Sequence, residues 1–391
     1  MKLPIRKQYL KELFTRKRRK KPLVLQLPIT SRCNSRCVTC GVYHNQEKVD
    51  IDPEKLKEVL SDPFFAGVQT VGVNGGEFTL VKSFLDIIEA ILTLPKISNI
   101  HIITNGLLPE KLFDLLLPTK ELCERKNVRL HLCLSCDGVG KIHETTRGVP
   151  NCFIRTKQIL DKMVCDKDQF CHEMSIGCTI SRYNVEHIWQ TYHFLSQYPF
   201  PVEYHLAVPN KRIGTFESSD YYVLNDEKSR LLAAEFFYIL YVHATDEPSR
   251  FQNFTNYYFL KTKGKMRLSE CEYRYRDVTI DEKMNLYLCA TASECVGDLN
   301  VSNATNLCTE GALDDEAKKL YKNCCSNCIH YSYHKHTLKG RWIFVRDYVT
   351  RLYAYQLFEL YTKKRTLGTI KEIAKVYYHI IRKSASYFRQ L

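Results

Sequence analysis

The sequence predicts an α/β fold in which six short strands form a parallel sheet, either open or curved into a partial barrel. Short apolar runs alternate with longer amphipathic segments from residue 23 to about residue 208, and this stretch shows no hairpin pattern. The 391 residues are 45% apolar and 26% charged, which is typical of a globular protein and excludes collagen-like and wholly disordered chains. This length accommodates one large domain with appendages, or two to three domains.

The six predicted strands are short apolar runs, namely 23–29, 68–73, 99–104, 128–135, 174–181 and 202–207. The helices expected between them are 53–60, 80–94, 109–125, 153–163 and 185–197. Asp52 is expected to cap the first of these helices and Asn184 the last. Because strand-then-helix units without hairpins give parallel strands, the carboxyl ends of the strands meet at one edge, where we expect the chemistry.

The rest of the chain has a different character. We expect a helical linker at 216–268, with its helix around 231–242, and a cysteine-rich region at 269–338 with a hairpin at 278–288. These regions follow a basic arm at 1–22 and a core domain at 23–215, and they precede a tail at 339–391. Two amphipathic helices are expected in the tail, at 341–361 and 368–389.

The net charge of +14 is concentrated at the two ends. Lys and Arg exceed Asp and Glu by nine in residues 1–22 and by nine in residues 339–391, so the intervening body carries about −4. Basic helices with an apolar face suit an anionic membrane surface, which predicts peripheral association with the inner face of the membrane. Packing of these helices on the body and RNA binding are the alternatives, and nucleic acid is the less expected partner because no recognised module is present.

The chain contains 17 cysteines and no secretory signal or 18-residue apolar run. We therefore expect a cytoplasmic protein whose reduced thiols bind metal. Cys33, Cys37 and Cys40 follow the first strand in a CxxxCxxC loop. Three thiolates can hold a 4Fe-4S cluster and leave one iron open, whereas zinc would need a fourth ligand such as His44.

Polar motifs also follow the next three strands. They are Asn-Gly-Gly-Glu at 74–77, Thr-Asn-Gly at 104–106 and Ser-Cys-Asp-Gly at 135–138. Adjacent glycines permit close approach of a ligand to the backbone, and Glu77 can accept a hydrogen bond from an ammonium group. Any one of these motifs alone is most simply a turn, but their order behind the cysteine loop indicates a site.

This set of motifs resembles the radical S-adenosylmethionine (SAM) superfamily, over about residues 23–208. The resemblance implies a partial (β/α)6 TIM-like barrel and a 4Fe-4S cluster on Cys33, Cys37 and Cys40 that chelates the amino and carboxylate groups of SAM. It implies an oxidoreductase or modifying enzyme in which SAM is reductively cleaved to a 5′-deoxyadenosyl radical, which then takes hydrogen from a substrate C–H bond.

The resemblance also implies which residues bind SAM: Gly75, Gly76, Glu77, Asn105, Ser135, Asp137 and Arg147. In the family the Gly-Gly-Glu turn holds the methionine ammonium, the polar residues after the fourth strand reach the ribose and carboxylate, and the arginine can pair with that carboxylate. Two positions depart from the family. Thr39 stands where an aromatic residue is common, and Phe78 stands where proline is usual.

The second cysteine group resembles the SPASM and twitch extensions of the same superfamily. The resemblance implies one auxiliary 4Fe-4S cluster, with ligands Cys271, Cys289, Cys325 and Cys328. Cys295, Cys308 and Cys324 are left over, and any of them could replace one of these ligands or belong to a second cluster. A zinc ribbon is the structural alternative.

The substrate is less constrained by the sequence. Glu203 and His205 on the sixth strand are the candidate catalytic residues, although His205 also fits a satisfied core histidine. We expect a sugar, cyclitol or lipid-linked glycan that undergoes oxidation, epimerisation or dehydration, with an electron donor such as flavodoxin or ferredoxin. A peptide-modifying maturase is one alternative, and a non-catalytic zinc protein that binds nucleic acid or acts as a scaffold is another.

Overall fold

The computed structural model of the chain describes residues 20–216, 219–330, 337–353, 371, 374–376, 378 and 382. Most of the basic arm predicted at 1–22 and most of the tail helix predicted at 368–389 therefore lie outside the described residues. Within the described residues, no helix is both long enough and apolar enough to cross a membrane.

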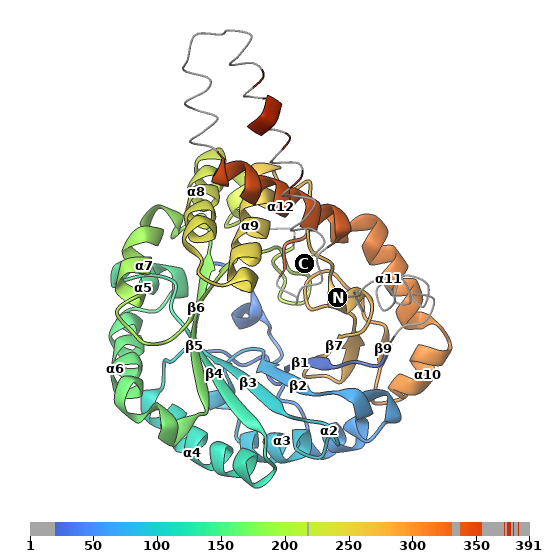
Figure 1. Cartoon of the computed structure of the whole chain (residues 1–391). Coiled ribbons are helices and arrows are strands. Elements are labelled where there is room, and N and C mark those ends of the chain that lie inside the picture. Colours follow the sequence, from blue (N-terminus) through green and yellow to red (C-terminus); the bar gives the residue numbers. More distant parts are fainter. Residues whose placement is uncertain are drawn as a thin grey trace. The chain divides into compact units, whose positions relative to one another are not determined.

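The predicted α/β fold is confirmed by a nine-stranded sheet with the order β6-β5-β4-β3-β2-β1-β7-β8-β9 (Figure 1). Six consecutive strands correspond to the parallel strands predicted from the sequence: β1 (Val24–Pro28), β2 (Thr70–Asn74), β3 (Asn99–Thr104), β4 (Arg129–Ser135), β5 (Glu173–Ile180) and β6 (Val202–Leu206). Each lies within two residues of its predicted bounds at either end. Alternate strand residues such as Ile100 and Ile102 are fully buried, as expected when one face of the sheet is covered by helices.

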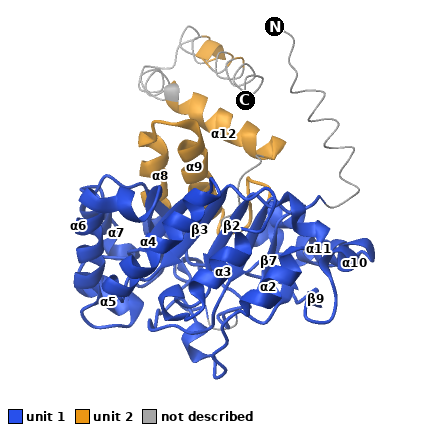
Figure 2. Ribbon diagram, turned by 90° about the horizontal axis from the view of Figure 1, so that it is seen from below, with its two compact units in different colours: residues 1–233, 272–332 blue, residues 234–271, 333–391 orange. Residues whose placement is uncertain are grey.

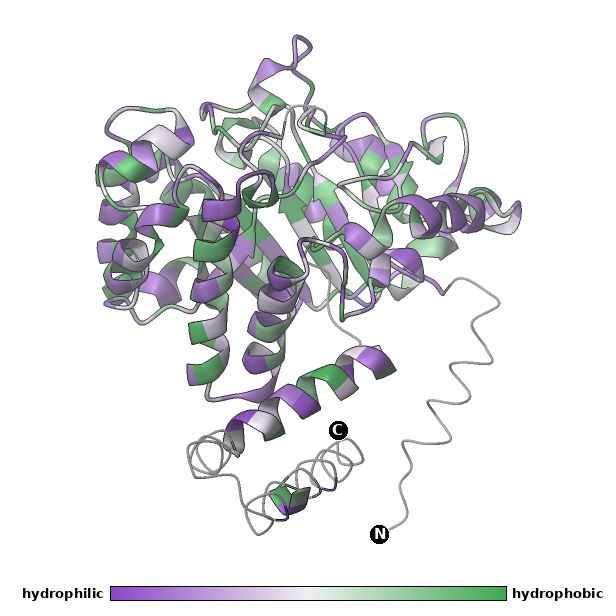
Figure 3. Cartoon of the chain, turned by 90° about the horizontal axis from the view of Figure 1, so that it is seen from above, coloured by the Kyte–Doolittle hydropathy of each residue, from purple (hydrophilic) through white to green (hydrophobic). Residues whose placement is uncertain are grey.

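Six helices accompany the parallel strands: α2 (Pro53–Leu60), α3 (Phe84–Ile91), α4 (Pro109–Arg125), α5 (Lys141–Arg147), α6 (Cys152–Phe170) and α7 (Ile188–Leu195). The bounds of α2 and α4 match the prediction, and Asp52 caps α2 by accepting a hydrogen bond from the Lys55 backbone N–H. In Figure 3 these helices carry both purple and green segments, as expected of helices with one buried face.

Several predicted details of these helices are wrong. The helix predicted at 80–94 begins only at Phe84, because a short 3-10 turn capped by Glu77 precedes it. The helix predicted at 153–163 extends to Phe170, and α5 was not predicted at all. Asn184 does not cap a helix through its side chain; its amide instead donates to the carbonyl oxygens of Asp137 and Thr179.

The predicted hairpin is present as β7 (Val278–Ile280) and β8 (Asn285–Tyr287), followed by the short strand β9 (Gly297–Asp298). Nothing in the sequence indicated that this hairpin continues the core sheet. β7 pairs in parallel with β1, with Leu25 opposite Val278, so the cysteine-rich region is joined to the barrel by backbone hydrogen bonds. Two helices, α10 (Ala304–Thr309) and α11 (Ala312–Asn323), follow the hairpin.

The chain divides into two compact units, shown in blue and orange in Figure 2. Unit 1 comprises residues 1–233 and 272–332, and unit 2 comprises residues 234–271 and 333–391. Unit 2 includes the second part of α8 (Glu227–His243), together with α9 (Glu247–Lys261) and α12 (Leu338–Leu352).

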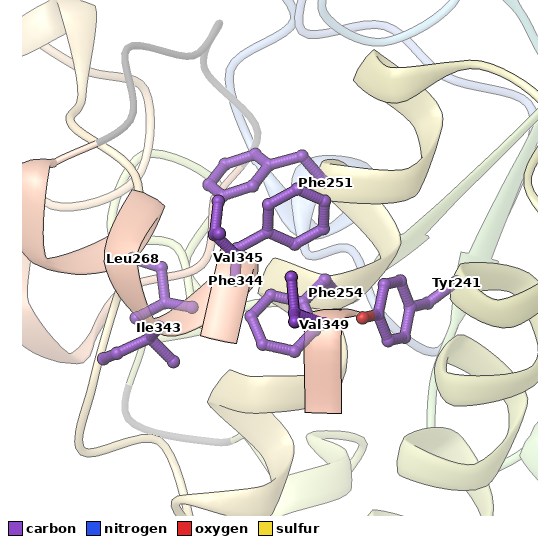
Figure 4. Packing of buried hydrophobic residues seen from close by; sticks show 8 residues of the cluster. All are labelled: Tyr241, Phe251, Phe254, Leu268, Ile343, Phe344, Val345 and Val349. Atoms are coloured by element: carbon purple, nitrogen blue, oxygen red, sulfur yellow. The ribbon is translucent and has the colours of Figure 1, made fainter. Parts of the chain in front are cut away.

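Unit 2 has an aromatic core in which α12 is buried against α8 and α9 (Figure 4). Phe344 contacts Phe251 and Phe254 with ring centroids 5.3 and 5.4 Å apart, and Val345 and Val349 are also buried. The sequence had suggested an apolar face for membrane contact on this helix. Much of the apolar face of α12 is instead covered by other residues of its own unit, which favours the packing alternative for this helix.

We predict that Phe344→Ala destabilises unit 2 by about 3–5 kcal/mol, because it removes a buried aromatic ring and leaves a cavity. The measurement is urea unfolding followed by fluorescence in a Trp189→Phe background, where Trp342 on α12 is the remaining tryptophan of the two in the chain. Leu338→Ala at the exposed start of α12 is the control and should cost below about 0.5 kcal/mol. Equal losses in the two variants would contradict the packing described for unit 2.

Candidate functional site

The cysteine loop after β1 takes its shape from hydrogen bonds to the end of α5. The backbone N–H of Arg36 donates to the Arg147 carbonyl at 2.9 Å, and that of Val38 donates to the Thr146 carbonyl at 3.0 Å. The Ser35 hydroxyl donates to the same Arg147 carbonyl. A loop without regular structure needs such partners for its buried backbone groups, so α5 holds the CxxxCxxC segment in place.

The Gly-Gly-Glu turn after β2 contacts the other side of this loop. The Gly76 N–H donates to the Thr30 carbonyl at 2.7 Å, and the Glu77 N–H donates to the Arg32 carbonyl at 2.8 Å. A Cβ atom on Gly76 would lie 1.8 Å from the Arg32 carbonyl oxygen, and Gly75 has a φ of +121°. Gly76 is therefore required by close backbone packing against Arg32, which precedes Cys33, and Gly75 is required by its positive φ and its packing against Thr30.

Glu77 is buried and bonded to groups of the protein itself. Its carboxylate accepts hydrogen bonds from the Thr104 hydroxyl and the Asn105 backbone N–H, both at 2.8 Å, and from the Thr79 hydroxyl at 3.1 Å. Burial raises the pKa of Glu77, and these hydrogen bonds oppose the rise. The carboxylate thus connects the end of β2 to the end of β3.

Asn105 continues this network to the cysteine loop. Its side-chain amide donates to the Asn34 side-chain oxygen at 2.9 Å and lies 3.8 Å from the Cys33 sulfur. Its own side-chain oxygen accepts from the Leu107 N–H at 2.9 Å. The strand ends that the sequence predicted to meet are thus joined to the first cysteine by side-chain contacts.

Asp137 and Arg147 form an ion pair beside Cys37, with 2.8 Å between the Asp137 Oδ2 and Arg147 Nη2 atoms. The Asp137 and Arg147 side chains are 3% and 12% exposed, and the other Asp137 oxygen accepts from the Thr179 N–H. Another guanidinium nitrogen of Arg147 lies 3.6 Å from the Cys37 sulfur. Asp137 and Arg147 were each predicted to contact SAM, and the structure shows that they also form an ion pair with each other.

One cavity of about 240 Å³ brings these groups together at the carboxyl edge of the sheet. All three loop cysteines line it, as do the predicted SAM residues Gly75, Gly76, Glu77, Asn105, Ser135, Asp137 and Arg147. Ile103 also lines it and is 39% exposed, which provides an apolar wall for a flat ring. Tyr43, an aromatic residue that the sequence analysis missed, lines it as well, close to Thr39.

The donor set fits an iron–sulfur cluster better than a single zinc ion. Ligand sulfurs on one tetrahedral zinc lie about 3.8 Å apart, given Zn–S bonds of about 2.3 Å. Among the described residues, one set of three potential ligand atoms lies within 4.8 Å of one another, and this set does not contain the loop cysteines or His44. His44 is also exposed. The Arg147 Nε atom is buried without a partner among the described residues and is left for a ligand.

Burial raises the pKa of the Cys33 thiol to about 12, although a hydrogen bond from Ser35 opposes the rise. Without metal this thiol is protonated, so cluster assembly must displace its proton. Burial likewise raises the pKa of Cys40, which lies close to the charge of Arg212.

Three of the four predicted auxiliary ligands belong to unit 1, and Cys271 is the last residue of the first segment of unit 2. Cys325 begins a 3-10 turn, and the Cys328 sulfur accepts a hydrogen bond from the His330 N–H at 3.3 Å. Burial raises the pKa of Cys324, and the nearby Cys289 thiol adds to this rise. Cys324, which the sequence left spare, is therefore also placed beside a predicted ligand.

The loop after β6 contains polar groups that the sequence analysis missed. Asn210 Oδ1, Arg212 Nε and, on the β7–β8 turn, Glu282 Oε2 are buried without a hydrogen-bond partner among the described residues. The loop packs on the cysteine loop, because a Cβ atom on Gly41 would lie 2.2 Å from the Ile213 carbonyl oxygen. Asn210 and Arg212 follow β6 and Glu282 follows β7, and these positions after strand ends are the sequence signal that could have identified the three residues.

The two candidate catalytic residues, Glu203 and His205, have side chains that contact different groups. The His205 Nε2 atom lies 2.9 Å from the Thr179 hydroxyl, and its Nδ1 atom lies 3.3 Å from the Glu203 carbonyl oxygen. Both ring nitrogens of His205 therefore have a partner within the protein, as in the alternative in which His205 is a hydrogen-bonded core histidine. The Glu203 carboxylate instead faces His101 and His131.

Residues 27–131 match the radical SAM superfamily. A similar curated protein, a GTP 3′,8-cyclase of Psychromonas ingrahamii, is 35% identical over 85 residues, which is 21% of this chain and 25% of that protein. The match thus spans about a quarter of the relative's length.

Solved structures share the fold at low sequence identity. One is anSMEcpe with bound AdoMet, which is SAM, and a Kp18Cys peptide, with a TM-score of 0.57, 18% identity and coverage of 85% of this chain and 99% of the other. Another is Streptococcus suis SuiB bound to the precursor peptide SuiA, with a TM-score of 0.51, 17% identity and coverage of 78% and 69%. These likenesses confirm the predicted fold class.

We predict that Gly76→Ala removes about half of the iron from anaerobically reconstituted protein. Its Cβ atom cannot fit beside the Arg32 carbonyl, so the cysteine loop must shift away from the geometry that holds its cluster. The measurement is iron and sulfide per chain. Lys141→Ala is the control, because the Lys141 side chain is exposed at the start of α5 and lies outside the cavity lining. Equal iron loss in both variants would contradict this role of Gly76.

Proposed function

We infer that this chain, a member of the radical SAM superfamily with a cysteine-rich extension like the SPASM and twitch regions, is an enzyme that cleaves SAM reductively and takes hydrogen from a substrate C–H bond. The observation that carries the inference is the single cavity lined by Cys33, Cys37 and Cys40 together with the Gly-Gly-Glu turn and the polar ends of β3 and β4. The site residues keep the roles predicted from the sequence as part of this proposal.

The chain's own residues supply binding and orientation. Cys33, Cys37 and Cys40 would hold the 4Fe-4S cluster, and Ile103 offers an apolar surface for adenine. A cluster with SAM bound at its open iron supplies one-electron cleavage of the sulfonium to a 5′-deoxyadenosyl radical. The Arg147 guanidinium, held by Asp137, keeps positive charge beside Cys37, where an anionic cluster or the SAM carboxylate would be stabilised.

Substrate recognition is proposed for the polar groups between the cysteine loop and the β7–β8 turn. Buried polar atoms without partners cost about 1–3 kcal/mol each unless a ligand satisfies them, and Asn210, Arg212 and Glu282 each provide one. A ligand that satisfies all three must offer donors to the Asn210 and Glu282 oxygens and an acceptor to the Arg212 Nε–H. Hydroxyl-rich sugars, cyclitols and lipid-linked glycans meet this requirement.

Peptide modification is the second candidate. It is favoured by the two structural neighbours named above, which were solved with a peptide or a precursor peptide bound. A backbone amide also offers a donor and an acceptor, so the three orphaned groups fit a peptide as well. In both cases Cys271, Cys289, Cys325 and Cys328 are proposed to hold the auxiliary cluster.

An electron donor such as flavodoxin or ferredoxin belongs to the proposal, because the cluster must be reduced before each cleavage. Contact with an anionic membrane is retained as a prediction for the basic ends alone. Its support is the concentration of Lys and Arg in residues 1–22 and 339–391.

We predict that the reconstituted protein forms 5′-deoxyadenosine from SAM and dithionite. Cys37→Ala should abolish this product, because the cluster loses one of three ligands. Cys165→Ala on α6 is the control, since this cysteine is exposed and lies outside the cavity lining. Wild-type protein with about eight irons per chain that gives no 5′-deoxyadenosine would refute the enzyme assignment, and a colourless protein that holds zinc would refute the clusters.

The substrate classes are separated by offering deuterated lipid-linked saccharides, free sugars and synthetic peptides, and scoring deuterium in 5′-deoxyadenosine. We predict that Arg212→Lys and Glu282→Gln each lower kcat/KM for the accepted class by about 10- to 100-fold, which corresponds to one charge-assisted hydrogen bond.

Both variants should leave SAM cleavage without substrate unchanged. Lys211→Gln is the neighbouring control, because the Lys211 side chain pairs with Glu294 at the surface. Unchanged kcat/KM in Arg212→Lys and Glu282→Gln would contradict this substrate site.

A further inference from the structure

Three potential metal ligands lie on the inner face of the sheet, below the cavity that holds the cysteines. His101 is on β3, His131 on β4 and Glu203 on β6. Side chains two residues apart on a strand point to the same face. His101 therefore shares a face with Ile103, and His131 with Ser135, both of which line the cavity. The three side chains occupy a deeper layer, toward the amino ends of the strands.

Their ligand atoms lie within 4.8 Å of one another, and no other set of three His, Cys, Asp or Glu side chains in the described part of the chain meets this criterion. The two imidazole rings stack with centroids 4.4 Å apart. The His101 Nε2 atom is buried and has no hydrogen-bond partner among the described residues. A buried nitrogen without a partner is costly, and the His101 ring lies beside a second imidazole and a carboxylate.

We propose that His101, His131 and Glu203 bind one divalent transition-metal ion, with zinc as the occupant. Two histidines and one carboxylate form a typical three-residue zinc set, which leaves one position for water. Ligand atoms at about 2.0–2.1 Å from a tetrahedral zinc lie about 3.4 Å apart, so the side chains need to approach by at most about 1.4 Å.

The surroundings support a metal site. The His131 Nε2 atom lies 2.8 Å from the Ser175 hydroxyl, a hydrogen bond that can orient the ring. Burial lowers the pKa of His101 to about 4, so its imidazole is neutral and its lone pair is available. His131 and Glu203 also line a second cavity, of about 560 Å³, bounded by residues 199–201, which gives an ion a route to the site.

The ion would act as a clamp across the sheet. It joins β3, β4 and β6 and passes over β5, so it fixes the curvature of the barrel beneath Ile103 and Ser135. All its ligands are nitrogen or oxygen, which separates it chemically from the cysteine clusters. The site does not depend on the proposed function, because a protein without SAM chemistry could bind the same ion.

The test uses holoenzyme reconstituted anaerobically with iron and sulfide, so that iron occupies the cysteine sites before zinc is added. After dialysis against micromolar Zn²⁺, we expect one zinc per chain by mass spectrometry. Zinc-edge X-ray absorption should show nitrogen and oxygen ligands at about 2.0–2.1 Å and lack the sulfur shell at about 2.3 Å. Absence of bound zinc, or a sulfur shell, would overturn the proposal.

Two variants locate the ion. His101→Ala and Glu203→Gln should each weaken zinc binding at least about 10-fold, whereas His193→Ala, an exposed histidine on α7, should not change it. Iron per chain and circular dichroism report whether each variant is folded. Because Glu203→Gln keeps the shape of the side chain, it decides the question if His101→Ala fails to fold. Unchanged zinc binding in a folded Glu203→Gln protein would refute the site.

Discussion

The cysteine loop depends on one set of contacts with the end of α5, a helix that lies more than a hundred residues further along the chain. Arg36 and Val38 have no helix or strand to satisfy their N–H groups, so they donate to the carbonyls of Arg147 and Thr146. Arg147 is in turn fixed by its buried ion pair with Asp137 at the end of β4. Because ordering a loop costs conformational entropy, this anchoring is what makes three convergent thiols possible before any iron binds.

Buried carboxylates act here as internal supports. Glu77 accepts hydrogen bonds from the end of β3, from Asn105 directly after it and from its own turn, and Asp137 is bonded to Arg147 and Thr179. A buried charge is tolerated only when it is paired or fully hydrogen-bonded. These contacts therefore fix the strand ends relative to one another, and they leave backbone groups and the orphaned Arg147 Nε atom for the ligand.

The loop after β6 connects the two cysteine regions within unit 1. The Ile213 carbonyl packs on Gly41, directly after Cys40, while the Lys211 N–H donates to the Thr291 carbonyl at 2.7 Å, two residues after Cys289. Next to these anchors along the chain, Asn210 and Arg212 carry buried polar atoms without partners among the described residues. Any substrate bound there would lie between the SAM cavity and the second cysteine group, which suits chemistry that draws on both.

The sequence by itself determined the six parallel strands, the cysteine loop and the strand-end motifs, because apolar periodicity and ligand spacing are local properties. Only the tertiary structure decided that Asp137 pairs with Arg147, that β7 extends the sheet, and that α12 buries Phe344 in unit 2. It also brought His101, His131 and Glu203 together from three strands. Contacts between residues far apart in the chain follow from strand register and packing, which no local pattern encodes.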